Sequence, residues 1–191
     1  MKAILDAKEF KRLIDNTKKF TRWEDANNKL MQYIHVIVDA KSMEIKAEAL
    51  DGYRISIEYG KLMEADESFS CFISPKIPVI VKGARHAELE LVDKKLLIRL
   101  GEFIVGCVQP EGEYFRVDEE LAKMQKDAPI KTIGINATYL EDAMKAAKNT
   151  EDWQPVIEMD VREPNEPVII RSGNRQGKQN LKVVLGVKIN H

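Results

Sequence analysis

One order of local signals occurs three times along the chain, and this repetition limits the possible folds more than any other feature. Each copy begins with a short apolar strand, continues through a capped helix and ends in three strands. The copies cover about residues 1–63, 68–117 and 130–190. Runs of antiparallel strands that each carry one helix are typical of an α+β fold. We therefore expect antiparallel sheets with the helices along one face.

The first repeat carries the clearest signals. Asp6 follows the apolar run at residues 3–5 and suits a helix N-cap, with Glu9 at the spacing of a capping box. Three strands are expected after a polar loop, at residues 33–38, 43–49 and 53–59. The intervening helix has one apolar face, formed by four residues at helical spacing: Phe10, Leu13, Ile14 and Thr17.

The second repeat has a weaker helix signal. A strand at residues 69–73 precedes Ser74 and Pro75, which suit an N-cap and the first position of a helix. Pro78 follows closely and predicts a short or distorted helix. The three strands of this repeat are expected at residues 87–92, 95–100 and 103–108.

The third repeat stands alone. A strand at residues 132–135 precedes Asn136, which caps a helix, and strands are expected at residues 155–161, 168–170 and 181–189. The repeats predict a complete domain at residues 1–117, a charged linker at 118–129 and a half domain at 130–191.

Composition indicates a soluble, intracellular protein. The chain has 30 Lys and Arg against 31 Asp and Glu, a net charge of −1. No apolar run approaches the length of about 18 residues needed to span a membrane. The start at Met1-Lys2 leads into charged sequence rather than a secretory signal, so we expect a cytoplasmic location. Cys71 and Cys107 lie far apart in apolar runs, which favours buried thiols over a disulfide.

Few residues suit catalysis. His35, His86 and His191 have no His, Cys or carboxylate neighbours at the spacing of metal ligands. His35 lies inside an apolar strand, where a satisfied sheet residue is the simplest interpretation. The sequence has no Gly-rich phosphate loop and no Gly-x-Ser-x-Gly elbow. We expect no enzyme, metal or cofactor, and a hydrolase built from scattered carboxylates is the remaining catalytic alternative.

Positive charge gathers on the expected helices. Six basic residues accompany only Glu9 and Asp15 in the first helix and its exit: Lys8, Lys11, Arg12, Lys18, Lys19 and Arg22. Lys82 follows the second expected helix and Lys145 lies on the third. Segregated charge can bind a phosphate backbone although the net charge is near zero. The alternative is that these are ordinary solvated helix faces.

Several segments resemble the bacterial DNA polymerase III beta sliding clamp, chiefly its middle domain. They are LDAKEFKRLIDNTKKF, AEALDGYRISIEY, GEFIVGCVQPEGEYFRV and IGINATYLEDAMKAA, followed by a terminal strand at residues 182–189. The family has an Ala-Thr-Asp-Gly-x-Arg turn, where this chain has Leu50 in place of Thr. The resemblance implies a DNA-clamp fold. Clamps have six repeats in three domains, so this chain corresponds to a shortened, clamp-like protein.

The resemblance also implies two binding surfaces. Basic helices line the DNA hole of a clamp, and the equivalents here are the eight basic residues named above. Clamps also dock partner peptides in an apolar groove between the middle and last domains. The equivalent positions are Gly52, Tyr53, Arg54, Ile55, Leu121, Val184, Leu185, Gly186 and Val187. The alternative is that these are ordinary strand and turn residues.

We therefore expect a non-catalytic replication factor, acting in polymerase processivity or as a scaffold. Its expected partners are double-stranded DNA, bound non-specifically through the backbone, and peptides of a DNA polymerase or other clamp-binding proteins. A half domain leaves sheet edges open, which predicts a homo-oligomer. The alternative function is a peptide-binding adaptor or decoy that does not encircle DNA.

Overall fold

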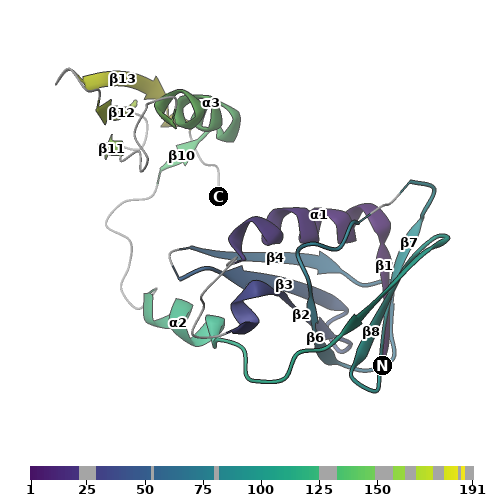
Figure 1. Ribbon diagram of the computed structural model, residues 1–191. Coiled ribbons are helices and arrows are strands. Elements are labelled where there is room, and N and C mark those ends of the chain that lie inside the picture. Colours follow the sequence, from purple (N-terminus) through teal and green to yellow (C-terminus); the bar gives the residue numbers. More distant parts are fainter. Residues whose placement is uncertain are drawn as a thin grey trace. The chain divides into compact units, whose positions relative to one another are not determined.

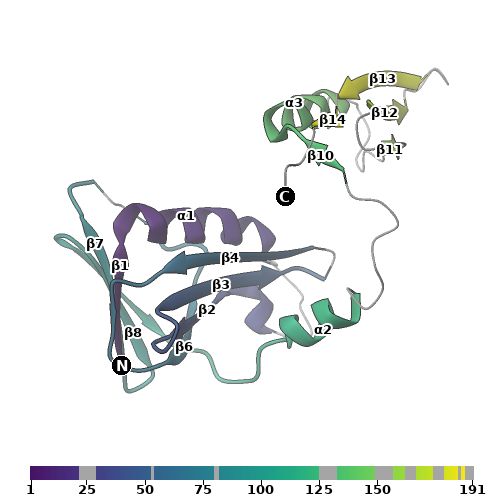
Figure 2. The same cartoon turned by 180° about the vertical axis from the view of Figure 1, so that it is seen from behind.

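The computed structural model describes residues 1–21, 29–52, 54–79, 82–124, 133–148, 157–161, 167–173, 179–184 and 186–187. The chain divides into two compact units, Met1–Val117 (unit 1) and Asp118–His191 (unit 2), which Figures 1 and 2 show from opposite sides. Both contain antiparallel sheets with few helices, so the expected α+β class is confirmed. None of the helices in the described segments is long and apolar enough to cross a bilayer.

Unit 1 contains two antiparallel sheets. One has the strand order β4-β3-β2-β6. Its strands are β2 (Ile34–Asp39), β3 (Glu44–Leu50), β4 (Ile55–Lys61) and β6 (Phe69–Ile73). The other has the order β5-β1-β7-β8-β9. Its strands are β1 (Lys2–Asp6), β5 (Glu64–Ala65), β7 (His86–Val92), β8 (Lys95–Leu100) and β9 (Phe103–Val108).

The two repeats of unit 1 exchange their first strands. β1 from the first repeat pairs antiparallel with β7 of the second, and Asp6 lies opposite His86. β6 from the second repeat pairs antiparallel with β2 of the first, and Ile73 lies opposite Ile34. Each sheet therefore needs a strand from both repeats, which joins the repeats into one unit.

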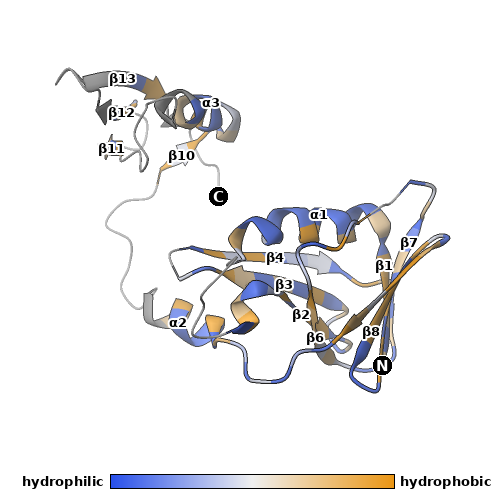
Figure 3. Cartoon of the chain, viewed as in Figure 1, coloured by the Kyte–Doolittle hydropathy of each residue, from blue (hydrophilic) through white to orange (hydrophobic). Residues whose placement is uncertain are grey.

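Helix α1 (Ala7–Thr17) begins and packs as the sequence predicts. The carboxylate of Asp6 accepts hydrogen bonds from the backbone N–H groups of Lys8 and Glu9, at 2.8 and 3.0 Å. Its four apolar-face residues are all buried, whereas Figure 3 shows hydrophilic positions along its outward surface. A 3₁₀ turn, η1 (Lys18–Phe20), continues the helix, and a second, η2 (Lys29–Gln32), precedes β2.

The helix expected in the second repeat does not form in the described residues 74–79 and 82–85. The N–H of Ile77 bonds to the carbonyl of Ser74 at 3.1 Å, which closes a single turn. Pro78 cannot donate the next backbone hydrogen bond, so the turn does not propagate. Lys82 consequently lies in an exposed turn rather than on a helix.

The segment expected to be a linker, residues 118–129, begins inside a helix, α2 (Val117–Met124). Asp118, Glu119 and Glu120 lie in its first turn. Negative charge there stabilises a helix by interaction with its dipole. The first part of the expected linker is therefore helical, and the division into a complete domain, a linker and a half domain stays a prediction.

Beyond α2, the described part of unit 2 contains the helix α3 (Ala137–Lys148), whose N-cap Asn136 accepts from the N–H of Thr138 at 2.9 Å. Its three-stranded sheet has the order β11-β12-β13, with β11 (Ile157–Asp160), β12 (Val168–Gly173) and β13 (Gln179–Val184). β10 (Gly134–Ile135) and β14 (Gly186–Val187) form a separate pair. The single strand expected at 181–189 is thus two strands with different partners.

The described residues of the two units form hydrophobic cores of very different size. Among the described residues, twenty buried apolar side chains form the core of unit 1, between the two sheets and α1. Four form that of unit 2: Ala143, Val168, Ile170 and Val184. Cys71 is buried and Cys107 half-buried, and both are free thiols, as expected. Burial raises the pKa of Cys71 to about 12, which suits a structural residue rather than a reactive one.

Candidate functional site

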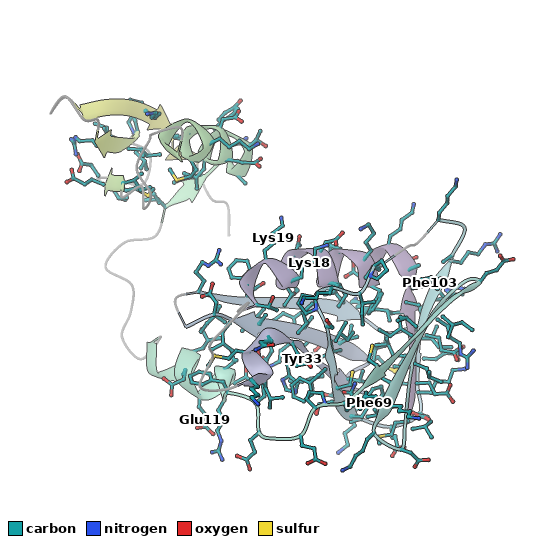
Figure 4. All side chains as sticks on the ribbon, viewed as in Figure 1. Lys18, Lys19, Tyr33, Phe69, Phe103 and Glu119 are labelled. Carbon is teal, nitrogen blue, oxygen red and sulfur yellow. The ribbon has the colours of Figure 1, made fainter. Side chains whose placement is uncertain are left out.

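Two of the predicted DNA-contact residues extend freely into solvent from α1 and η1. Lys8 and Lys19 are exposed, and neither forms an ion pair with any residue that the structure describes. Figure 4 shows Lys19 pointing away from the sheets. Lys8 lies in the first turn of α1, and Lys19 lies eleven positions later in the 3₁₀ turn that continues it, so the two lysines mark opposite ends of this helical segment.

Lys11 and Lys18 share one carboxylate instead. Lys18 Nζ lies 2.5 Å from Asp15 Oδ1, and Lys11 Nζ contacts Asp15 Oδ2. Partial burial raises the pKa of Asp15, but the hydrogen bonds and charges of the two lysines outweigh burial and leave that pKa below its usual value. The carboxylate is therefore ionised at neutral pH and offsets part of the positive charge of this face.

Arg12 joins α1 to the neighbouring sheet. Its guanidinium bonds to both carboxylate oxygens of Glu9, at 2.7 and 3.0 Å, to the carboxylate of Glu58, and to the carbonyl of Tyr59 at 2.7 Å. The hydrogen bond from Arg12 is the largest influence on Glu9, and it lowers the pKa of that carboxyl. Arg12 lies on the exposed side of the helix, as predicted, but its bonding groups are occupied within unit 1.

The other predicted DNA-contact residues lie on separate elements. Lys82 is exposed in its turn. Lys145 is exposed on α3, where its Nζ lies 3.0 Å from Glu141 Oε1, one helical turn away. Arg22 lies outside the described residues. The structure therefore brings five of the eight residues together, on α1 and η1.

The predicted peptide-docking residues of unit 1 surround one turn. Gly52 has a φ of 90°, a conformation that favours glycine. The guanidinium of Arg54 bonds to the Asp51 carboxylate at 2.6 and 3.0 Å and to the carbonyl of Lys19 at 3.2 Å. It also stacks on the Phe20 ring, 5.0 Å from the ring centre. This turn is thereby fixed to the end of α1.

Asp51 and Phe20 were not among the predicted site residues, although they hold Arg54 in place. The spacing of three residues between Asp51 and Arg54 could have indicated the ion pair. Nothing local could have indicated Phe20, which is 34 residues away. Ile55 opens β4 and is half-buried, and Tyr53 lies outside the described residues.

The docking residues predicted in unit 2 lie on three elements. Leu121 is half-buried on α2, and Val184 is buried at the end of β13. Gly186 and Val187 form β14, opposite Ile135 and Gly134 of β10. Leu185 lies outside the described residues. The peptide groove that would combine residues of units 1 and 2 stays a prediction.

A buried polar cluster lies on the four-stranded sheet, apart from these surfaces. Glu48 is 3% exposed, and its carboxylate contacts His35 Nδ1 at 2.8 Å and Lys46 Nζ at 3.0 Å. His35 also stacks on Phe72, with ring centres 5.0 Å apart. His35 is therefore a satisfied sheet residue, as predicted. Over the described part of the chain, no three His, Cys or carboxylate side chains lie together in a way that could hold a metal.

Comparison with known proteins identifies the architecture. No protein-family model matches the sequence, and no curated protein matches it. Solved structures do. A protein assigned as a DNA polymerase III beta subunit from Eubacterium rectale is 21% identical, with a TM-score of 0.78 over 97% of this chain and 50% of its own. The DNA polymerase sliding clamp from Bacillus subtilis is 13% identical, with a TM-score of 0.77 over 97% of this chain and 49% of its own.

The DNA polymerase III beta chain from Streptococcus pneumoniae agrees with both, at 16% identity and a TM-score of 0.75 over 98% of this chain and 50% of its own. Identity at this level identifies a fold and leaves the activity open. The chain therefore has the fold of the DNA polymerase III beta sliding clamps, and it spans about half the length of the clamp chains that it matches.

Proposed function

We propose that the chain is a non-catalytic, clamp-like DNA replication factor of the cytoplasm, which supports polymerase processivity or acts as a scaffold. The observation that carries this proposal is the clamp fold, which extends over 97% of the chain. In a clamp, function depends on contact with DNA and on docking of partners rather than on chemistry. The two surfaces built on α1 and on the Asp51–Arg54 turn give this chain a means of doing each.

DNA contact would depend mainly on Lys8 and Lys19. Both ammonium groups are exposed and available for phosphate oxygens, whereas Arg12, Lys11 and Lys18 already have carboxylate partners. Contacts of this kind carry no sequence information. Each neutralised phosphate contributes about −0.9 to the slope of log affinity against log salt. We propose lesser contributions from Arg22, Lys82 and Lys145.

The experiment compares retention on nicked circular DNA with retention on the same DNA made linear. A chain that encircles DNA stays on the circle and slides from the open ends. Combining Lys8→Ala with Lys19→Ala should weaken binding uniformly across sequences and reduce the salt slope by about two. The matched control combines Lys41→Ala with Lys95→Ala, two exposed lysines away from α1. Equal losses in both double variants would remove the α1 surface from the proposal.

Partner docking would use the apolar positions beside Arg54. An apolar groove with one arginine at its rim suits a short peptide whose anchors are Leu or Phe. We propose that such peptides come from a DNA polymerase or from other clamp-binding proteins. Arg54 is 57% exposed although it bonds to Asp51, so one edge of its guanidinium faces solvent. We propose that Gly52, Arg54 and Ile55 form the unit 1 side of the groove.

The second candidate function is an adaptor or decoy that binds the same peptides without encircling DNA. The ion pairs of α1 favour it, because Glu9, Asp15 and Glu58 offset three of its basic residues. The two functions differ in one result. Peptide binding without retention on either DNA form would favour the adaptor, whereas retention on circles alone would favour the clamp.

A further inference from the structure

Among the described residues, β11 is an outer strand of the three-stranded sheet of unit 2. β11 pairs with β12 and with no other strand that the structure describes. β10, the first strand of this repeat, lies outside that sheet and pairs over only two residues with β14. The third repeat therefore keeps its first strand apart from its own sheet, as the repeats of unit 1 do.

Unit 1 shows which strand occupies the equivalent edge. The strand after the helical segment is β2 in the first repeat and β7 in the second, and β11 is its equivalent in the third. β2 pairs with β6 and β7 pairs with β1, so each takes the first strand of the other repeat. By the same rule, β11 pairs with the first strand of a third repeat other than its own. That strand is β10 of a second copy of the chain.

We propose that two copies of this chain exchange their β10 strands, each pairing with β11 of the other copy. The product, here called the strand-exchange dimer, has two sheets of the order β14-β10-β11-β12-β13 and two α3 helices, related by a two-fold axis. In each sheet β14 and β10 come from one copy and the other three strands come from the other. An interface of this kind is self-complementary, because each copy donates its own β10 and receives the partner's β10 through the same contact. The strand-exchange dimer rests on the proposed function and specifies which strands pair in the homo-oligomer expected for it.

Unit 1 also gives the register. In both of its exchanges the last residue of the donated strand lies opposite the first residue of the receiving strand, Asp6 opposite His86 and Ile73 opposite Ile34. Applied to the third repeat, this places Ile135 opposite Ile157 of the other copy. The pairing is antiparallel, so Ile133 then lies opposite Met159.

The side chains agree with that register. Ile133, Ile135 and Ile157 all pack against the core of unit 2. Met159 is two residues from Ile157 in β11 and so shares its face. A register shifted by one residue would place Ile135 opposite Glu158 and would turn the apolar side chains of β10 to the face away from the core.

The open edge is also an exposed apolar surface. Met159 is 42% exposed and Val161 43% exposed. Residues 157–161 contain no Lys and no Pro, and of their two carboxylates Asp160 is paired with Arg171 of the neighbouring strand. A second copy of β10 would cover this surface and enlarge a core that has only four buried residues in its described part.

The test mixes two full-length single variants, Ile133→Cys and Met159→Cys, in equal amounts under an added oxidant. Directly opposed residues of paired strands have Cβ atoms about 4.5–5.5 Å apart, close enough for a disulfide after small adjustment. The mixture should give a covalent heterodimer on a non-reducing gel. The matched control is a mixture of Ile133→Cys with Val183→Cys, an exposed position on β13. It should form no covalent dimer on the same gel.

Light scattering gives a second measurement that needs no cysteine. The unmodified chain should show twice the 21.8 kDa of one chain or a multiple of that dimer. Met159→Lys should reduce the mass by half, and Val183→Lys should leave it unchanged. A monomer at about 100 µM, or a cross-link equal to that of the control, would overturn the strand-exchange dimer. Neither result involves DNA, so a failure of DNA retention would count against the proposed function alone.

Discussion

At the residue scale, Asp15 decides how much of the positive charge on α1 is available. Lys11 and Lys18 both bond to it, and they hold its pKa below the usual value against the effect of burial. A carboxyl with a lowered pKa stabilises the folded state at pH values above its unfolded pKa. That stabilisation is lost as the pH falls through the lower, folded pKa.

Asp15→Asn should therefore reduce the loss of stability in acid. Between about pH 5 and pH 2, the free energy of unfolding should fall more for the unmodified chain than for the variant. The difference should stay below about 1 kcal/mol, because the ion pairs of Asp15 are partly solvent-exposed. Thermal unfolding followed by circular dichroism across this range measures it. Asp93→Asn is the control, since Asp93 makes no ion pair among the described residues. Parallel curves for Asp15→Asn and the unmodified chain would contradict the assignment.

Some of these side-chain contacts can be predicted from the local sequence, and others cannot. The N-cap at Asp6 and the apolar face of α1 follow from spacing alone, because both depend on residues within a few positions. Lys11 and Lys18 lie four and three positions from Asp15, so their ion pairs could also have been predicted. The bond from Arg12 to Glu58 joins residues 46 positions apart. Only the folded sheet brings those two side chains together.

At the element scale, α1 packs closely on β4 at Gly60. A Cβ atom placed there would lie 3.1 Å from Leu13 Cδ1, 3.1 Å from Glu9 Oε1 and 3.2 Å from Ile45 Cγ2. Leu13 and Ile45 are both 1% exposed and have little room to move. The glycine therefore permits the distance between helix and sheet.

Gly60→Ala should destabilise unit 1 by about 1–3 kcal/mol, the usual cost of overpacking. Gly106→Ala, in the neighbouring sheet, is the matched control, because its Cβ atom would approach only Leu97 Cδ2, at 3.4 Å. Urea unfolding of both variants provides the comparison. A loss of stability at Gly106 equal to that at Gly60 would show that close packing against α1 is not the cause.

The elements also show where sequence patterns stop being informative. Alternation of apolar and polar residues predicted the strands of unit 1 and the face that each one buries, since side chains alternate across a sheet. It gave no information on partners, so the exchange of β1 and β6 could not be predicted. The helix after Ser74 was expected to be short or distorted, and in its described residues only a single turn forms, because Pro78 interrupts the hydrogen bonding.

At the scale of the whole molecule, the two units differ in how much they can support themselves. Unit 1 has two exchanged sheets and twenty buried apolar residues, whereas the described part of unit 2 has four. Small cores stabilise a fold only marginally, and association is one way to supplement them. Unit 2 should therefore depend on the strand-exchange dimer, and unit 1 should not.

Calorimetry of the full chain can separate these two behaviours. We expect two unfolding transitions, the lower one from unit 2. Because dissociation accompanies the unfolding of unit 2, a tenfold increase in protein concentration should stabilise its dimer by about 1.4 kcal/mol and raise the lower midpoint by about 5 °C. The upper midpoint should stay fixed. Met159→Lys should remove the concentration dependence, and Val183→Lys should preserve it. A lower transition that is independent of concentration in the unmodified chain would mean that unit 2 folds without a second copy.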